Sequence, residues 1–173
     1  MHPAFFYLQA LSMRIGVVSD THNNLKNVAK IVELFNAAGV DRVIHTGDIT
    51  QAKTIDVFAH LNAPMYGVYG NNDQERDSLE AAVARHGFVF CEPPYVDVWA
   101  ERELIVVHDP LEFEGHLQTH HTLALHGHTH FYRHEQVGET TFFNPGECAG
   151  HMAGYNAIGV VDLVSLETEL LRF

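Results

Sequence analysis

The sequence predicts one α/β domain, and three observations lead to this prediction. Strand and helix patterns alternate through the first half of the chain, while the second half carries almost only strand patterns. The chain has 173 residues, which is enough for one substantial core but short for two. With 46% hydrophobic and 18% charged residues, its composition is typical of a globular protein.

The first half predicts a largely parallel sheet with helical connections. Residues 13–19 (MRIGVVS) form a short apolar run that is typical of a strand. Residues 25–38 then carry apolar side chains at helical spacing, and Gly39 follows as a stop signal. The alternation continues with strands at 42–45 and 65–69 and with helices at 53–60 and 74–86.

The second half predicts a further sheet, which we expect to be mainly antiparallel because its strands follow one another closely. Glycines separate many of these strands, and one short helical piece is expected within residues 111–120. The predicted strands are 88–90, 95–100, 103–107, 122–125, 131–136, 140–143, 157–163 and 167–173.

Nothing in the sequence divides the region 13–173, so we expect it to be a single domain. Residues 1–12 are expected to be an N-terminal extension: they are apolar but lack the basic segment of a signal peptide, and Met13 is an alternative start. The extension could pack on a second copy, so an oligomer stays open. No run approaches the roughly 18 apolar residues of a membrane span, and we expect a cytoplasmic location without a membrane partner. Cys91 and Cys148 lack metal-type spacing and are expected to be buried free thiols.

Charge and histidine content direct attention to metal chemistry. Lys and Arg number 10 against 22 Asp and Glu, a net charge of −12, which argues against an extended nucleic-acid surface. A small phosphorylated substrate is still compatible with this charge if bound cations supply local positive charge. The 14 histidines are unusually many and suggest metal ligands.

Acidic, amide and imidazole side chains follow five predicted strands, at the edge where ligands of α/β sheets gather. These segments are DTH at 20–22, GD at 47–48, GNND at 70–73, the lone His108, and GHTH at 127–130. Two divalent ions that lie close together need a shared anionic ligand. Asp48 suits this role, because a carboxylate has two oxygens and Gly47 before it leaves room for close approach. Such ligands suit manganese, iron, cobalt, nickel or zinc.

Together with NPG at 144–146, this ordered set resembles the calcineurin-like metallophosphoesterase superfamily, and most closely its small single-domain bacterial and archaeal phosphodiesterases. The resemblance extends from residue 13 to about residue 173. It implies a four-layer αββα sandwich, in which two mixed β-sheets pack face to face with helices outside.

The resemblance also implies two ligand sets that share Asp48. Asp20, His22, Asp48 and His130 would hold the first ion, and Asp48, Asn71, His108 and His128 the second. Manganese is the expected ion, with iron, zinc, nickel and cobalt as alternatives. His126 receives no ligand role: it either orients a ligand by a hydrogen bond or is a packed core residue.

We therefore expect a dinuclear-metal-dependent phosphoesterase that hydrolyses phosphodiesters by attack of a metal-bridging hydroxide, with Asp48, Asn71 and His128 as catalytic residues. One alternative is a non-catalytic scaffold of the same fold, such as a retromer subunit; another is a metal-binding protein. The complete ligand set favours the enzyme.

Departures from the family pattern raise specific questions. Asn72 stands where many members have a histidine that assists the leaving group, which predicts a preference for good leaving groups. Asp109-Pro110 follow His108 where relatives often have glycine. Glu147 replaces the small hydroxyl residue of the NPGS element and points either inward or into solvent.

The remaining histidines are expected mostly outside the site. His45 is expected to pack near it and His151 to lie at the surface, while one of His116, His120 and His121 could reach substrate.

Overall fold

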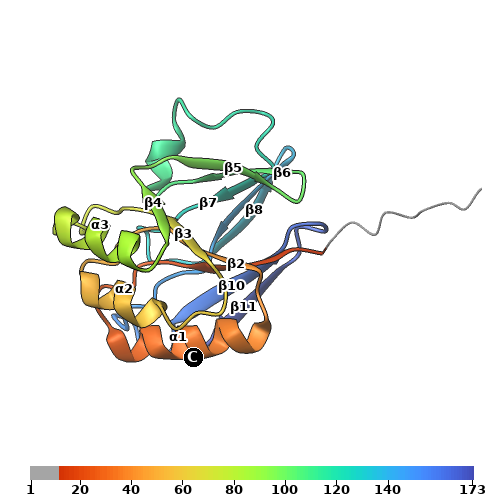
Figure 1. Cartoon of the computed structure of the whole chain (residues 1–173). Helices are drawn as coiled ribbons and strands as arrows, with labels where there is room; N and C mark the ends of the chain where they lie inside the picture. The colour runs from red at the N-terminus through yellow and green to blue at the C-terminus, as the bar shows by residue number, and fades with distance from the viewer. Residues whose placement is uncertain (1–11) are drawn as a thin grey trace, which may run out of the picture.

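The computed structural model describes residues 12–173, which form two β-sheets stacked face to face with helices against one of them (Figure 1). The extension predicted over residues 1–12 lies outside the described residues except for Ser12. Within 12–173, no helix is long and apolar enough to span a bilayer. Both cysteines are free; Cys148 is buried and Cys91 half-buried.

The first sheet combines a parallel core with two antiparallel strands at one edge. Its order is β11-β10-β1-β2-β3-β4 in the described part of the chain. The parallel strands are β1 (Arg14–Val18), β2 (Arg42–His45), β3 (Met65–Val68) and β4 (Val89–Cys91). The antiparallel strands are β10 (Ala157–Asp162) and β11 (Thr168–Arg172). β1 therefore lies inside the sheet, between β10 and β2.

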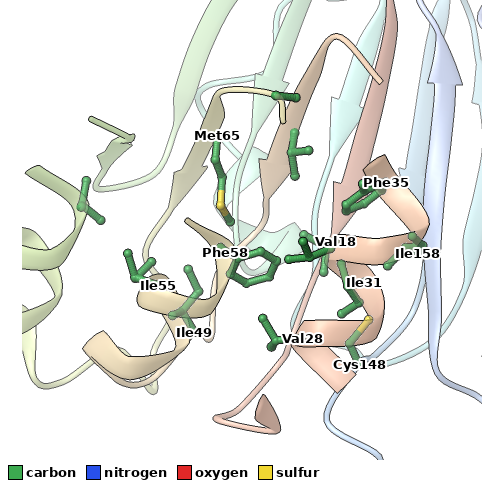
Figure 2. Packing of buried hydrophobic residues seen from close by; sticks show 14 of the residues in the cluster. Val18, Val28, Ile31, Phe35, Ile49, Ile55, Phe58, Met65, Cys148 and Ile158 are labelled. Atoms are coloured by element: carbon green, nitrogen blue, oxygen red, sulfur yellow. The ribbon is translucent and has the colours of Figure 1, made fainter. Parts of the chain in front are cut away.

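The helices α1 (Leu25–Ala38), α2 (Ala52–Phe58) and α3 (Arg76–Arg85) cover one face of this sheet. α1 begins after Asn24, whose side chain accepts a hydrogen bond from Asn27 N, and ends at Gly39 in a left-handed conformation (φ 63°). Phe35 and Phe58 are fully buried between these helices and the sheet (Figure 2). This packing holds the connections that leave β1, β2 and β3.

The second sheet has the order β5-β6-β7-β9-β8 in the described residues and is mixed. Its strands are β5 (Tyr95–Trp99), β6 (Arg102–Val106), β7 (Leu123–Leu125), β8 (Arg133–Val137) and β9 (Thr140–Asn144). The expectation of a mainly antiparallel sheet is wrong, because β6–β7 and β7–β9 pair in parallel and only β5–β6 and β8–β9 pair antiparallel. β10 and β11 also lie in the second half of the sequence, but β10 pairs with β1 and β11 with β10, so both extend the first sheet.

The four-layer architecture is confirmed, although its fourth layer is thin. A 3-10 turn, η1 (Pro110–Phe113), and the loop after it cover the outer face of the second sheet. Phe113 packs there in a small cluster with Ile105, Ala124 and Phe142. Between the sheets, Val17 and Ile44 pack in one cluster with side chains of the second sheet.

Candidate metal centre

All seven residues of the predicted ligand sets lie together at one edge of the stacked sheets, where β1, β2, β3, β6 and β7 end. Backbone hydrogen bonds tie neighbouring strand ends to each other: Asp20 N donates to Gly47 O, and Gly127 N donates to His108 O. The parallel pairing of β1 with β2 and of β6 with β7 therefore sets the positions of the loops.

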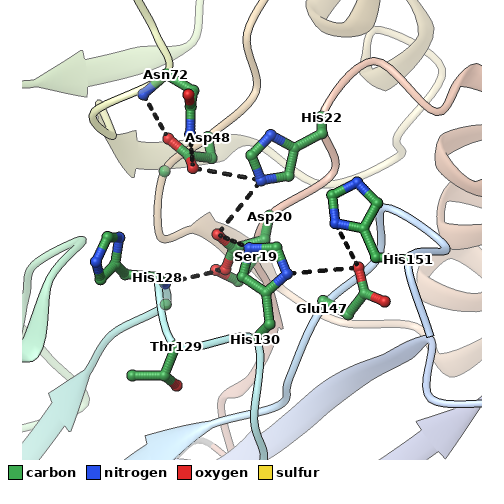
Figure 3. Close-up of polar contacts among 12 residues, drawn as sticks. Ser19, Asp20, His22, Asp48, Asn72, His128, Thr129, His130, Glu147 and His151 are labelled. Carbon is green, nitrogen blue, oxygen red and sulfur yellow. Dashed lines mark hydrogen bonds and ion pairs between the residues drawn. The ribbon is translucent and has the colours of Figure 1, made fainter.

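The first donor group consists of Asp20, His22, Asp48 and His130 (Figure 3). His22 Nε2 lies 3.8 Å from Asp20 Oδ1 and 3.3 Å from Asp48 Oδ2. His130 Nε2 lies 3.3 Å from the same Asp20 Oδ1. Asp20 Oδ1 and His22 Nε2 are buried and lack a hydrogen-bond partner within the described residues. Buried unpaired polar atoms are destabilising. The ligand atoms of Asp20, His22 and His130 lie within 4.8 Å of one another, so these three residues fit a shared cation.

The second donor group consists of Asp48, Asn71, His108 and His128. His108 Nε2 lies 3.4 Å from Asp48 Oδ1, 3.0 Å from Asn71 Oδ1 and 3.3 Å from His128 Nδ1. Asp48 thus presents Oδ2 to the first group and Oδ1 to the second. This geometry matches the bridging role that the sequence predicts for its carboxylate.

Hydrogen bonds from neighbouring residues fix the orientation of these donors. Asn72 donates from its backbone N to Asp48 Oδ1 (2.9 Å) and from Nδ2 to Asp48 Oδ2 (2.7 Å). The His108 Nδ1–H donates to the Thr46 carbonyl (2.9 Å), which directs Nε2 toward the second donor group. Ser19 Oγ donates to Asp20 Oδ2. Asn72 therefore holds the shared carboxylate, a role that the sequence analysis did not assign.

Asp73 is a further residue that the sequence analysis did not single out, although it completes the GNND segment. Its Oδ2 accepts hydrogen bonds from Asp48 N (3.0 Å) and Gly70 N (2.6 Å), and its Oδ1 accepts one from Thr50 N (2.6 Å). Asp73 thereby joins the loops after β2 and β3. Asp73 lies among turn residues, so apart from its place in the GNND motif the sequence did not indicate that it joins these loops.

Close packing at the site requires glycine at three positions: a Cβ on Gly47 would lie 2.5 Å from His108 Nδ1. A Cβ on Gly70 would overlap Asp48 Oδ1 and lie 2.5 Å from Asp48 N. A Cβ on Gly127 would overlap Ser19 Oγ and lie 2.8 Å from Asp20 Oδ2. These glycines let the loops from the two sheets approach each other.

Five of the seven predicted ligands have left-handed backbone conformations, which non-glycine residues adopt uncommonly. Their φ angles are 50° for Asp20, 40° for His22, 60° for Asp48, 64° for His128 and 61° for His130. Such conformations persist where the surrounding structure enforces them, and they cluster at functional sites.

Burial and ionic partners shift the pKa values of His108 and Asp48 in opposite directions. Burial alone would lower the pKa of His108, but the adjacent Asp48 carboxylate raises it to about 9. Burial likewise opposes ionisation of Asp48, yet His108 and Asn72 hold its pKa well below the usual range. His45 is fully buried, and burial lowers its pKa to about 3. The predicted place of His45 near the site is confirmed: it contacts Thr21 Oγ1 (3.2 Å) and accepts from Gly47 N (3.1 Å).

Glu147 points inward, which decides between the two alternatives left open by the sequence. It is fully buried, and its Oε1 accepts a hydrogen bond from Met152 N (2.8 Å). Its Oε2 lies 3.7 Å from His130 Nδ1. His151 is exposed as predicted, but its ring also stacks on His130, with 5.5 Å between the centroids.

The remaining histidines have other roles. His126 is buried with its ring edge against Phe113, and its Nδ1 lies 3.0 Å from Gly127 O, so the core alternative holds. His120 pairs with Glu103 near the start of β6, whereas His108 follows the end of that strand. His120 therefore lies away from the predicted ligands, and the suggestion that one of His116, His120 and His121 reaches substrate stays a prediction.

A cleft of about 280 Å³ opens beside the second donor group. His128 Nε2 lies 3.6 Å from Asp109 Oδ2, so the residue that replaces the family glycine faces a predicted ligand. The cleft is lined by Tyr69, Gly70, Asn71, Glu92, Pro93, His108, Asp109, Glu112 and His128. Among these described residues there are three carboxylates and no Lys or Arg.

Two stacked sheets whose strand ends bring carboxylate, amide and imidazole side chains together are typical of a metal-dependent hydrolase. The sequence profile of the calcineurin-like phosphoesterase superfamily domain matches residues 13–166, and the chain belongs to this superfamily. It is thus a phosphoesterase of a family that uses divalent metal ions.

Individual relatives agree with this assignment. The chain is 36% identical to Phosphodiesterase MJ0936 of Methanocaldococcus jannaschii over 162 residues, 87% of this chain and 93% of the relative. A solved structure of a novel archaeal phosphodiesterase superposes with a TM-score of 0.83 at 31% identity, covering 93% of this chain and all (100%) of the other. A Vps29 mutant from Entamoeba histolytica shares the fold, with a TM-score of 0.64 at 18% identity and coverage of 93% and 99%.

Proposed function

We propose that this protein hydrolyses phosphodiesters at a dinuclear metal centre. The proposal depends on one observation: the two carboxylate oxygens of Asp48 face different donor groups. The name of the Methanocaldococcus jannaschii relative, a phosphodiesterase at 36% identity, supports the same reaction class.

The donor types indicate which residues would hold the ions. Asp20, His22, Asp48 and His130 would hold one, and Asp48, Asn71, His108 and His128 the other. Two divalent cations supply a water molecule of lowered pKa and neutralise charge on the phosphate oxygens. Imidazole, carboxylate and amide ligands without thiolate suit manganese, iron, zinc, nickel or cobalt, and of these manganese is our proposal.

The cleft favours diesters over monoesters as substrates. A phosphodiester carries one negative charge at pH 7, whereas a monoester carries close to two, since its second pKa is about 6. Asp109 and Glu112 line the approach to the second donor group and repel the more highly charged ester, whereas the charge of Glu92 is paired with Arg76. Asn72 cannot act as a general acid, because an amide does not release a proton in this pH range. A diester with a good leaving group is therefore the preferred small substrate.

The test is turnover of bis(p-nitrophenyl) phosphate by metal-stripped protein that is reloaded with Mn²⁺, with p-nitrophenyl phosphate as the monoester control. We expect ion-dependent hydrolysis of the diester, which Asp48→Asn and His128→Ala abolish. Two bound ions without turnover would support the metal-binding alternative. If the protein neither binds ions nor hydrolyses the diester, the result would support the non-catalytic scaffold. The superposition with Vps29 is compatible with a scaffold of this fold.

A further inference from the structure

Glu147 is a fully buried carboxylate that the proposed reaction does not use. Its Oε1 accepts a hydrogen bond from Met152 N, but its Oε2 lacks a hydrogen-bond partner within the described residues. An anion in this environment is costly unless another group compensates it. Figure 3 shows Oε2 directed between two imidazole rings, 3.7 Å from His130 Nδ1 and 3.9 Å from His151 Nδ1.

We propose that Glu147 is a positioning residue for His130: it accepts a hydrogen bond from the Nδ1–H and so directs Nε2 toward the first metal ion. The inference rests on the proposed metal centre. His130 Nε2 already faces Asp20 Oδ1 at 3.3 Å, on the side of the first donor group. A neutral imidazole has one protonated nitrogen, and the hydrogen bond at one nitrogen sets which nitrogen is the ligand. The contact of 3.7 Å must shorten by roughly 0.7 Å to reach ordinary hydrogen-bond length.

The same role explains how the buried charge is compensated. When Nε2 of His130 binds a cation, the ring becomes a stronger donor at Nδ1, and the Glu147 carboxylate lies on that side. The pair then resembles the carboxylate–histidine–metal arrangement of many metal sites. His108 has a neutral counterpart of this interaction, since its Nδ1–H donates to the Thr46 carbonyl.

A third ion bound by His130, Glu147 and His151 is the competing explanation, since their ligand atoms lie within 4.8 Å of one another. It would require His130 to coordinate through both nitrogens and so to lose both ring protons. A neutral imidazole offers only one free lone pair. The hydrogen-bond role needs no such ionisation and therefore fits the geometry better.

Glu147→Gln separates these roles, because the substitution keeps the size of the side chain and removes its charge. One carboxamide position must face the Met152 N–H and the other His130 Nδ1. Whichever way the amide is placed, its NH₂ group meets another donor. We expect the affinity of one of the two ions to fall about 10- to 100-fold, the range typical of such outer hydrogen bonds, with the other ion little affected.

The experiment uses the full chain loaded with Zn²⁺, which is diamagnetic. Long-range ¹H–¹⁵N NMR spectra of the histidine rings report which His130 nitrogen carries the proton, and calorimetry reports stoichiometry and affinity. We expect two ions and an Nδ1–H tautomer in the wild type, and selective loss of affinity in Glu147→Gln. His151→Gln is the matched control, because it removes the other ring beside Glu147; it should retain both affinities.

Three results would overturn the inference while leaving the proposed function intact. They are an Nε2–H tautomer in the loaded wild type, a third bound ion that Glu147→Gln removes, and unchanged affinities in Glu147→Gln. The tautomer measurement needs only the wild type, so an Nε2–H tautomer would refute the inference even if the variant does not fold. A wild type that binds no ion would instead refute the metal centre itself.

Discussion

Metal loading at pH 7 should release at least one proton, and His108 should be its main source. The Asp48 carboxylate raises the pKa of His108 to about 9, so the ring of the metal-free protein is about 99% protonated at pH 7. A metal ion binds only the neutral ring, and the proton must leave. Two pKa units correspond to about 3 kcal/mol, or about a 100-fold weaker apparent affinity at pH 7 than for the fully deprotonated ring.

The direction of the pH dependence follows from this raised pKa. Apparent affinity should increase about tenfold per pH unit between pH 6 and 8 and level off above about 9. The stability of the metal-free protein should change in the opposite direction. The contribution of charged His108 is complete below pH 6.5, its ordinary pKa, and is lost as the pH rises through about 9.

Calorimetry at pH 7 in two buffers of different ionisation enthalpy measures the number of protons released. His86→Gln is a suitable control, because His86 pairs with Asp56 on the helical side of the protein. It should leave the release unchanged. A release near zero, or an affinity that does not vary from pH 6 to 8, would refute the assignment of His108 as a protonated ligand.

Three further predictions concern packing and chemistry. Gly70→Ala should abolish ion binding in calorimetry while circular dichroism stays native, because its Cβ would displace the Asp48 carboxylate; retained binding would contradict the close contact. Phe58→Ala should lower the free energy of unfolding by about 3–5 kcal/mol in urea titrations, since the ring is fully buried. A loss below about 1 kcal/mol would mean that the ring is not part of the core. Asn72→His should increase turnover of alkyl diesters relative to aryl diesters, because imidazole can donate a proton to a poor leaving group; an unchanged ratio would exclude this position from leaving-group chemistry.

Local sequence patterns were sufficient to predict most of the individual elements. The helix expected over residues 25–38 has these bounds in the structure, because apolar spacing and a terminal glycine define both the buried face and the end. The pairing of strands was less accessible. The parallel neighbours of β7 are β6 and β9, and neither pairing leaves a mark in the residues themselves. Pairing depends on how connections cross the sheet, which local periodicity does not encode.

The gathering of the seven predicted ligands at one edge could be predicted, because each follows a strand and the ends of parallel strands share an edge. The residues that orient the ligands could not. Asn72 was considered only as a missing proton donor, whereas its two hydrogen bonds hold Asp48. Glu147 belongs to the loop after β9, and its contact with His130 depends on the path of that loop through the interior. Such contacts arise from tertiary packing and have no fixed spacing in sequence.

The left-handed backbone of the five predicted ligands has a consequence for attempts to engineer this protein. Each such residue costs up to about 1–3 kcal/mol, against a total stability of about 5–15 kcal/mol for a typical domain. Screening a variant library for heat resistance alone would therefore enrich glycine at positions such as Asp20 and Asp48, where it relieves the backbone. The most heat-resistant variants from such a screen would lack predicted metal ligands and would be inactive. Each round therefore has to select for turnover as well.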